Sequence, residues 1–228
     1  PSPNGGGSSD FSASNPGRAP HICIMTSSRM PAVFLGHGSP MIALETNDAT
    51  RAWAALAASI PRPKAILCVS AHWVTEGVAV TAMAQPKTIH DFGAFPQALF
   101  DVQYPAPGDP ALAERVRNLL QPLDVVLDAD SWGLDHGAWS VLRKLYPDAD
   151  IPVVQLSLDG TKPPEWHYAV GQKLAALRDE GVLILGTGNI VHNLRLMDRD
   201  PKAAHDWAVR FDDASKAAIV EDRPQDVI

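Results

Sequence analysis

Three histidines lie close to the ends of apolar segments that are far apart in the chain: His37 in "VFLGHGSP", His72 in "KAILCVSAHW" and His192 in "VLILGTGNIVHNL". Imidazole is the commonest protein ligand for metal ions, and its neutral form offers one ring nitrogen to the ion. In open α/β sheets, the loops at the carboxyl ends of the strands converge on one crevice. A single histidine at such a place would be an ordinary loop or core residue, but three with the same placement favour a metal site.

A fourth histidine, His136 in "SWGLDHGAW", lies between two tryptophans. It is either a loop histidine packed between aromatic rings or a proton-transfer group whose charge is tuned by its neighbours. His90 in "HDFGAFP" and Tyr104 in "YPAPG" suit the lining of a pocket for a planar substrate, although core packing explains Tyr104 equally well.

Several common catalytic and cofactor motifs are missing from the sequence. "GTGNIV" lacks the third glycine of a dinucleotide-binding loop, because Val191 stands in its place. "GHGSP" does not fit the nucleophile-elbow pattern GxSxG, and there is no HExxH zinc motif.

The elements that must position these histidines alternate between short apolar runs and longer segments of helical periodicity. Runs that predict strands occupy residues 32–35, 65–69, 78–83, 125–127, 151–158 and 182–185. Helices are expected around 53–60, after the Asp109 cap with its following proline, and over 164–180, where Gly181 suits a helix end. Strands that are apolar on both faces and separated by helices predict an α/β fold, with a mainly parallel or mixed central sheet covered by helices on both faces.

Composition narrows the class of protein. The 228 residues are 46% hydrophobic, which is enough for one sizeable core, so we expect a single domain over 30–228 after a flexible Gly-, Ser- and Pro-rich extension over 1–29. A formal charge of -7 without a basic block argues against nucleic-acid binding. No apolar run reaches the roughly 18 residues of a membrane span, so we expect a cytoplasmic protein with no membrane partner.

Six motifs, in their order along the chain, resemble one known family. "FLGHGSPM", "VSAHW", "IHDFGAFP", "YPAPG", "WGLDHGAW" and "GTGNIVHNL" look like the class III extradiol ring-cleavage dioxygenases, in particular the DOPA 4,5-dioxygenase branch of the LigB-like superfamily. The resemblance runs from about Met30 to Leu194.

This resemblance implies a single-domain α/β enzyme that opens a catechol ring with O2 at one divalent metal ion. The ion would be non-haem Fe(II) for ring cleavage, and Zn(II) in the protein as isolated. The resemblance further implies that His37 and His72 are metal ligands, that His192 is either a third ligand or a base, and that His136 is an acid/base group.

Other functions remain open. Members of the branch continue to a Pro-Glu-His type motif that completes the metal site, and the sequence after His205 contains no histidine. We therefore expect the catalytic domain to lack a C-terminal segment. A zinc-dependent hydrolase, which would use an open water position on the ion, and a non-catalytic metal-binding scaffold remain as alternatives.

Overall fold

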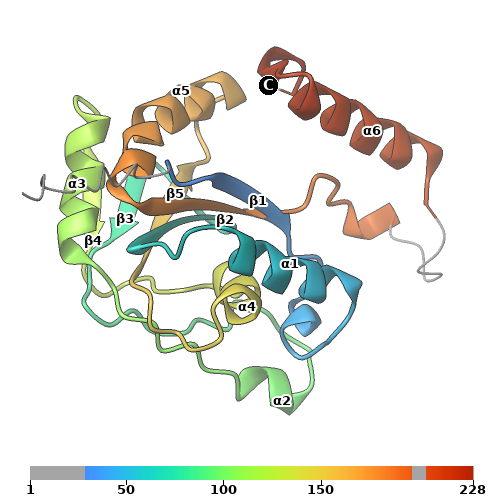
Figure 1. Cartoon of the computed structure of the whole chain (residues 1–228), viewed down its shortest axis with the longest axis horizontal. Coiled ribbons are helices and arrows are strands. Elements are labelled where there is room, and N and C mark those ends of the chain that lie inside the picture. The colour runs from blue at the N-terminus through green and yellow to red at the C-terminus, as the bar shows by residue number, and fades with distance from the viewer. Residues whose placement is uncertain (1–28, 197–203, 228) are drawn as a thin grey trace, which may run out of the picture.

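The computed structural model describes residues 29–196 and 204–227 (Figure 1). The expected flexible extension over 1–29 lies outside the described residues, apart from Arg29. Met30 is already buried, and its amide donates a hydrogen bond to the Arg178 carbonyl at 3.0 Å.

A six-stranded sheet forms the centre of the molecule, with the strand order β1-β6-β2-β5-β3-β4. Its strands are β1 (Ala32–Gly36), β2 (Ala65–Thr75), β3 (Val78–Thr81), β4 (Val125–Asp128), β5 (Val153–Asp159) and β6 (Val182–Gly188). All neighbouring strands are parallel except β3 and β5, which pair antiparallel through Val80 and Leu156. All six predicted strands are present, and the expected α/β class with a mixed, mainly parallel sheet is confirmed.

Helices cover both faces of this sheet. The helices among the described residues are α1 (Asp48–Ser59), α2 (Gln97–Phe100), α3 (Pro110–Leu120), α4 (His136–Leu145), α5 (Pro164–Leu174) and α6 (Asp206–Val220). Helices α1 and α4 lie on one side of the sheet and α5 on the other (Figure 1). Trp53 of α1 and Trp139 of α4 pack into one buried cluster, whereas Val116 of α3 and Leu174 of α5 belong to a second one. The sheet therefore separates two hydrophobic layers.

Local signals in the sequence explain where the helices begin and end. Asn47 caps α1 in a reciprocal capping box with Thr50, and the Asp109 side chain caps α3 just before Pro110. The expected helix over 164–180 is α5 followed by a 3-10 turn over Ala175–Glu180. Gly181 ends it with a φ of 88°, a left-handed conformation that favours glycine.

Two expectations about elements were wrong. Strand β2 continues to Thr75, with a shift of register between Val69 and Val74, so His72 lies within the strand rather than after it. Of the two alternatives for His136, the loop histidine is wrong, because His136 is the first residue of the ten-residue helix α4. Among the described residues, none of the helices is both long and apolar enough to cross a membrane.

Candidate metal centre

His37 is held at the carboxyl end of β1 by backbone contacts with β6. Its amide donates to the Gly188 carbonyl at 3.0 Å, which continues the parallel ladder one residue beyond Gly36. The next residue, Gly38, has a φ of 61° and donates its amide to Asn189 Oδ1 at 2.9 Å. This left-handed turn leaves the His37 side chain only 2% exposed, under the edge of the sheet.

His72 lies in β2, which β6 separates from β1 in the sheet, yet its ring reaches His37. The Nε2 atoms of the two rings are 3.0 Å apart, and the ring centroids are 5.0 Å apart. The His72 amide donates to Ser70 Oγ at 3.2 Å where the register of β2 shifts. The register shift in β2 therefore lies in the same part of the strand as His72.

His136 joins them from the first turn of α4. Its ring centroid lies 3.9 Å from that of His72 and 5.5 Å from that of His37. The preceding residue, Asp135, caps the helix by accepting from the Ala138 amide at 3.1 Å. The Asp135 carboxylate is fully buried and also accepts from Ser70 Oγ at 2.7 Å and from Gln155 Nε2, so it ties α4 to β2 and β5.

The three imidazoles form a group that could hold one metal ion. Each offers one ligand atom, and these atoms all lie within 4.8 Å of one another. Two imidazole nitrogens 3.0 Å apart can share at most one hydrogen, and Nδ1 of the buried His37 has no hydrogen-bond partner among the described residues. A cation between the rings would use the lone pairs that face one another, and clustered imidazoles suit Zn(II), Fe(II) and related ions. The residues present fit a divalent transition metal.

Burial and mutual repulsion lower the pKa values of two of these rings, His37 and His72. The pKa of His37 is lowered to about 4, chiefly by desolvation and then by repulsion from His72, His136 and His192, with Asp91 acting in the opposite direction. Desolvation, followed by repulsion from His136, also lowers the pKa of His72. Because only neutral imidazole carries a free lone pair, both rings are ready to bind a cation at neutral pH.

Asp91 is the site residue that the sequence reasoning missed. Its Oδ1 accepts the backbone amide of His136 at 2.8 Å and lies 2.9 Å from His136 Nδ1, and its Oδ2 is 3.6 Å from His72 Nδ1. Burial alone would raise the pKa of Asp91, but the contacts with His136 outweigh it and the pKa is lowered. The only signal in the sequence is its place beside His90 in "HDFGAFP".

The other predicted residues occupy different environments. His192 is exposed and lies outside the group of three, although it is near enough to lower the pKa values of His37 and His72. His90 Nε2 lies 3.0 Å from the Val102 carbonyl oxygen, within an aromatic cluster. Tyr104 is buried and donates its hydroxyl to the Tyr146 carbonyl at 2.8 Å, so it serves core packing rather than a pocket.

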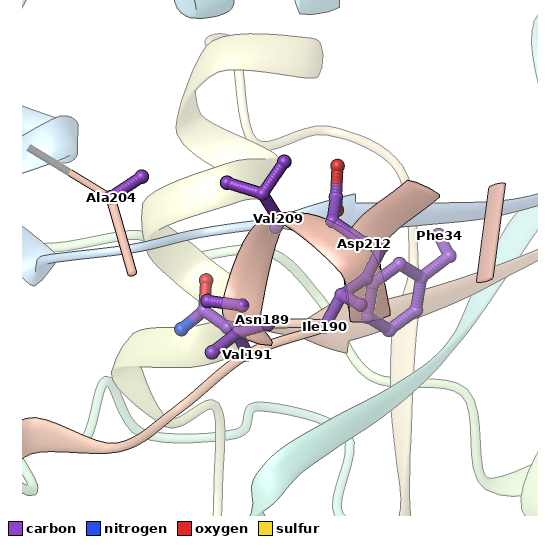
Figure 2. A pocket seen from close by; sticks show the side chains of 9 residues that line it. Phe34, Asn189, Ile190, Val191, Ala204, Val209 and Asp212 are labelled. Atoms are coloured by element: carbon purple, nitrogen blue, oxygen red, sulfur yellow. The ribbon is translucent and has the colours of Figure 1, made fainter. Parts of the chain in front are cut away.

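An open cavity of about 560 Å³ lies between the β1 and β6 ends and helix α6 (Figure 2). Its lining includes Gly36, the residue before His37, and Val191, the residue before His192. Phe34, Ile190 and Val209 give it apolar walls, and none of the three clustered histidines is part of the lining. The cavity is therefore separate from the candidate centre, although two of its lining residues are neighbours of His37 and His192 along the chain.

The chain belongs to the family described as the catalytic LigB subunit of aromatic ring-opening dioxygenase, which matches residues 25–228. The resemblance seen in the motifs is thereby confirmed, as is the expected class of enzyme, an extradiol aromatic ring-opening dioxygenase.

Within this family, the chain is similar to proteins of one branch. The chain is 57% identical, over 202 residues, to the 4,5-DOPA dioxygenase extradiol of Escherichia coli (strain K12), covering 88% of this chain and 74% of that protein. It is 38% identical, over 200 residues, to the 4,5-DOPA dioxygenase extradiol of Beta vulgaris, covering 85% of this chain and 74% of the relative. A crystal structure of the uncharacterized protein JW3007 from Escherichia coli K12 superimposes with a TM-score of 0.72 and 52% identity, covering 83% of this chain and 72% of that one.

Proposed function

We propose that this dioxygenase opens the ring of a DOPA-like catechol with O2 at one Fe(II) ion. One observation carries the proposal. His37, His72 and His136 come from three remote segments, and their possible ligand atoms lie within 4.8 Å of one another. The names of the E. coli and Beta vulgaris relatives support a DOPA-like substrate.

His37 and His72 would hold the ion through Nε2. Their Nε2 atoms already face each other, and their lowered pKa values leave both rings neutral under ordinary conditions. When bound, Fe(II) supplies a redox-active centre with open positions for both catechol and dioxygen, whereas Zn(II) has no accessible redox change. We therefore propose Fe(II) as the metal for turnover and Zn(II) as an inactive substitute.

His136 would transfer protons beside the ion. Its Nδ1 is 2.9 Å from the Asp91 carboxylate, and its other nitrogen is left free to exchange a proton with a catechol hydroxyl. A carboxylate beside an imidazole stabilises the imidazolium that forms when the ring accepts a proton. His136 is almost fully buried, so the proton would pass to or from substrate rather than bulk water.

His192 would act at the mouth of the site. It is exposed and outside the group of three, yet it influences the pKa values of His37 and His72. We therefore propose it as the base that removes a catechol proton as substrate enters, rather than as a third ligand. The preceding residue, Val191, lines the apolar cavity between β6 and α6.

The proposal is tested by supplying L-DOPA under air to protein loaded with Fe(II). The expected result is consumption of O2 equal to that of DOPA, with a yellow ring-opened semialdehyde, since the ring carbon–carbon bond breaks and both oxygen atoms enter the product. Protein loaded with Zn(II) should show neither change. Oxygen uptake without a new absorbing product would contradict extradiol cleavage, and turnover without oxygen would point to hydrolysis instead.

A further inference from the structure

One carboxylate, Asp91, faces two of the three clustered imidazoles. Its Oδ1 is 2.9 Å from Nδ1 of His136, and its Oδ2 is 3.6 Å from Nδ1 of His72. The Asp91 side chain is only 17% exposed, so solvent weakens these interactions little. Both rings therefore turn the same nitrogen, Nδ1, toward the same acid.

The position of Asp91 is fixed by the backbone of α4. Its Oδ1 accepts the His136 amide, the first of the helix, at 2.8 Å. Within residues 29–196 and 204–227, neither lysine nor arginine forms an ion pair with Asp91. The Asp91 carboxylate therefore faces the two imidazoles without a competing side-chain cation among these residues.

The other buried acid near the site, Asp135, does not contact the imidazole nitrogens. Its oxygens accept from Ser70 Oγ, from Gln155 Nε2 and from the Ala138 amide, all on the core side of the site. Asp135 holds the elements together, whereas Asp91 contacts the ring nitrogens themselves.

Which nitrogen of a neutral imidazole carries the hydrogen decides which one can bind a metal. A carboxylate facing Nδ1 favours the form with hydrogen on Nδ1 and a lone pair on Nε2. In His72, Nε2 is the atom that lies 3.0 Å from His37 Nε2, at the centre of the cluster. For His136, the contact with Asp91 is close but lacks the alignment of a hydrogen bond, so a small rotation of the ring would complete it.

We propose that Asp91 is a positioning residue that sets the tautomer of both His72 and His136, so that the Nε2 lone pair of each points toward the metal and substrate. This inference rests on the proposed metal-binding role of His37 and His72. Carboxylates that orient metal-binding histidines typically change metal affinity about 10- to 100-fold when they are replaced.

The first test measures metal affinity in Asp91→Asn against wild type and against Asp101→Asn. Asp101 is an exposed acid ten residues along the chain that contacts Gln97, so its replacement removes the same charge without touching the site. Zn(II) affinity is measured by competition with a chromophoric chelator at pH 8. We expect Asp91→Asn to bind Zn(II) about 10- to 100-fold more weakly, with Asp101→Asn close to wild type.

The second test reads the tautomers directly, because a merely structural role for Asp91 would leave them unchanged. Long-range ¹H–¹⁵N spectra of metal-free protein labelled at histidine are recorded at pH 8, with signals assigned through His72→Gln and His136→Gln. Wild type should show both rings with hydrogen on Nδ1, and Asp91→Asn should show mixed tautomers. Should Asp91→Asn fail to fold, the wild-type spectrum still decides, because hydrogen on Nε2 of His72 would overturn the inference.

The outcomes separate this inference from the proposed function. Unchanged Zn(II) affinity or unchanged tautomers in Asp91→Asn, with normal uptake by wild type, would overturn the role of Asp91 alone. Wild-type protein that binds no Zn(II) would overturn the proposed metal centre as well.

Discussion

His37 links the site to folding, because its ring is the most deeply buried of the three. Its pKa is about 4 in the folded protein against an ordinary 6.5, and the main cause is desolvation. Burial favours the neutral imidazole, which can bind a metal ion. The same burial lowers the pKa, so the ring is a weak base.

This burial predicts a pH dependence of stability in metal-free protein. Between pH 6.5 and 4 the unfolded chain binds more protons at His37 than the folded chain, so stability is complete above pH 6.5 and falls as pH falls toward 4. The loss from this residue is about 3 kcal/mol. Urea unfolding in the presence of a chelator, at pH 7 and at pH 4.5, measures it.

His37→Gln provides the control for that measurement, because glutamine does not titrate. Its free energy of unfolding should fall less than that of wild type over the same pH range, by roughly the His37 contribution. Parallel pH profiles for the two proteins would show that His37 is not the cause.

Metal uptake distinguishes the roles proposed for the clustered histidines. His37→Ala and His72→Ala should lose stoichiometric uptake, because each removes one of the facing Nε2 atoms. His136→Ala should keep the metal and lose turnover, since that ring is proposed to transfer protons. Elemental analysis and oxygen consumption check both expectations, with His205→Ala, a replacement on the exposed surface, as the control.

Full metal content in His37→Ala or His72→Ala would contradict the ligand assignment. Loss of metal in His136→Ala would instead make this residue a ligand.

The sequence indicates His37 and His72 well, because both follow apolar residues that must enter the sheet. It could not reveal that Asp91 faces His72 and His136, since those contacts join residues 19 and 45 positions away along the chain. An aspartate in a loop next to an aromatic run is ordinary in a sequence, and only the approach of α4 to β2 gives it partners.

Among the elements, α4 and β2 matter most for the site because their backbones approach closely at Gly137. A Cβ at that position would lie 2.5 Å from Ser70 Oγ and 2.8 Å from His72 Cδ2. Only glycine allows the first turn of α4 to lie against the ring of His72 without displacing it.

Gly137→Ala should therefore both destabilise the protein and weaken metal binding. Overpacking of this kind costs about 1–3 kcal/mol, and the least constrained response is a shift of His72 away from His37. Thermal unfolding and Zn(II) titration measure the two effects.

Gly171→Ala in α5 is the matched control, because a Cβ there meets no atom within 4 Å. Alanine in a helix interior should leave metal binding unchanged and raise stability by up to about 1 kcal/mol. Equal metal affinity in Gly137→Ala and Gly171→Ala would show that the contact with His72 does not position the ring.

At the level of elements, periodicity and composition predicted the strands better than the helices. Apolar runs such as 182–185 are buried on both faces, so local composition alone marks them as strands. Helix α4 is hard to predict locally because Gly137 lies in its first turn, where glycine weakens a helical pattern, and because its start depends on the buried Asp135 cap. The extension of β2 to Thr75 was missed because its last residues follow a shift of register, which pairing with β5 imposes.

At the scale of the whole molecule, the mainly parallel sheet brings the three clustered histidines together. His37 follows β1, His72 lies in β2 and His136 begins α4, yet their ligand atoms lie within 4.8 Å of one another. The α/β class and the crevice at the strand ends could be predicted, because parallel strands must end on the same edge. The sequence could not predict that His136, rather than His192, joins His37 and His72. The position of His192 depends on the path of the backbone after Gly188.

The central claim is that one ion lies between His37 and His72, next to His136. The most direct measurement is an anomalous difference map from crystals of the protein loaded with Zn(II) or Fe(II). We predict a single strong peak at coordination distance, about 2.0–2.1 Å for Zn(II), from Nε2 of His37 and Nε2 of His72. A metal peak elsewhere in the molecule, or no peak between these two rings, would contradict the account.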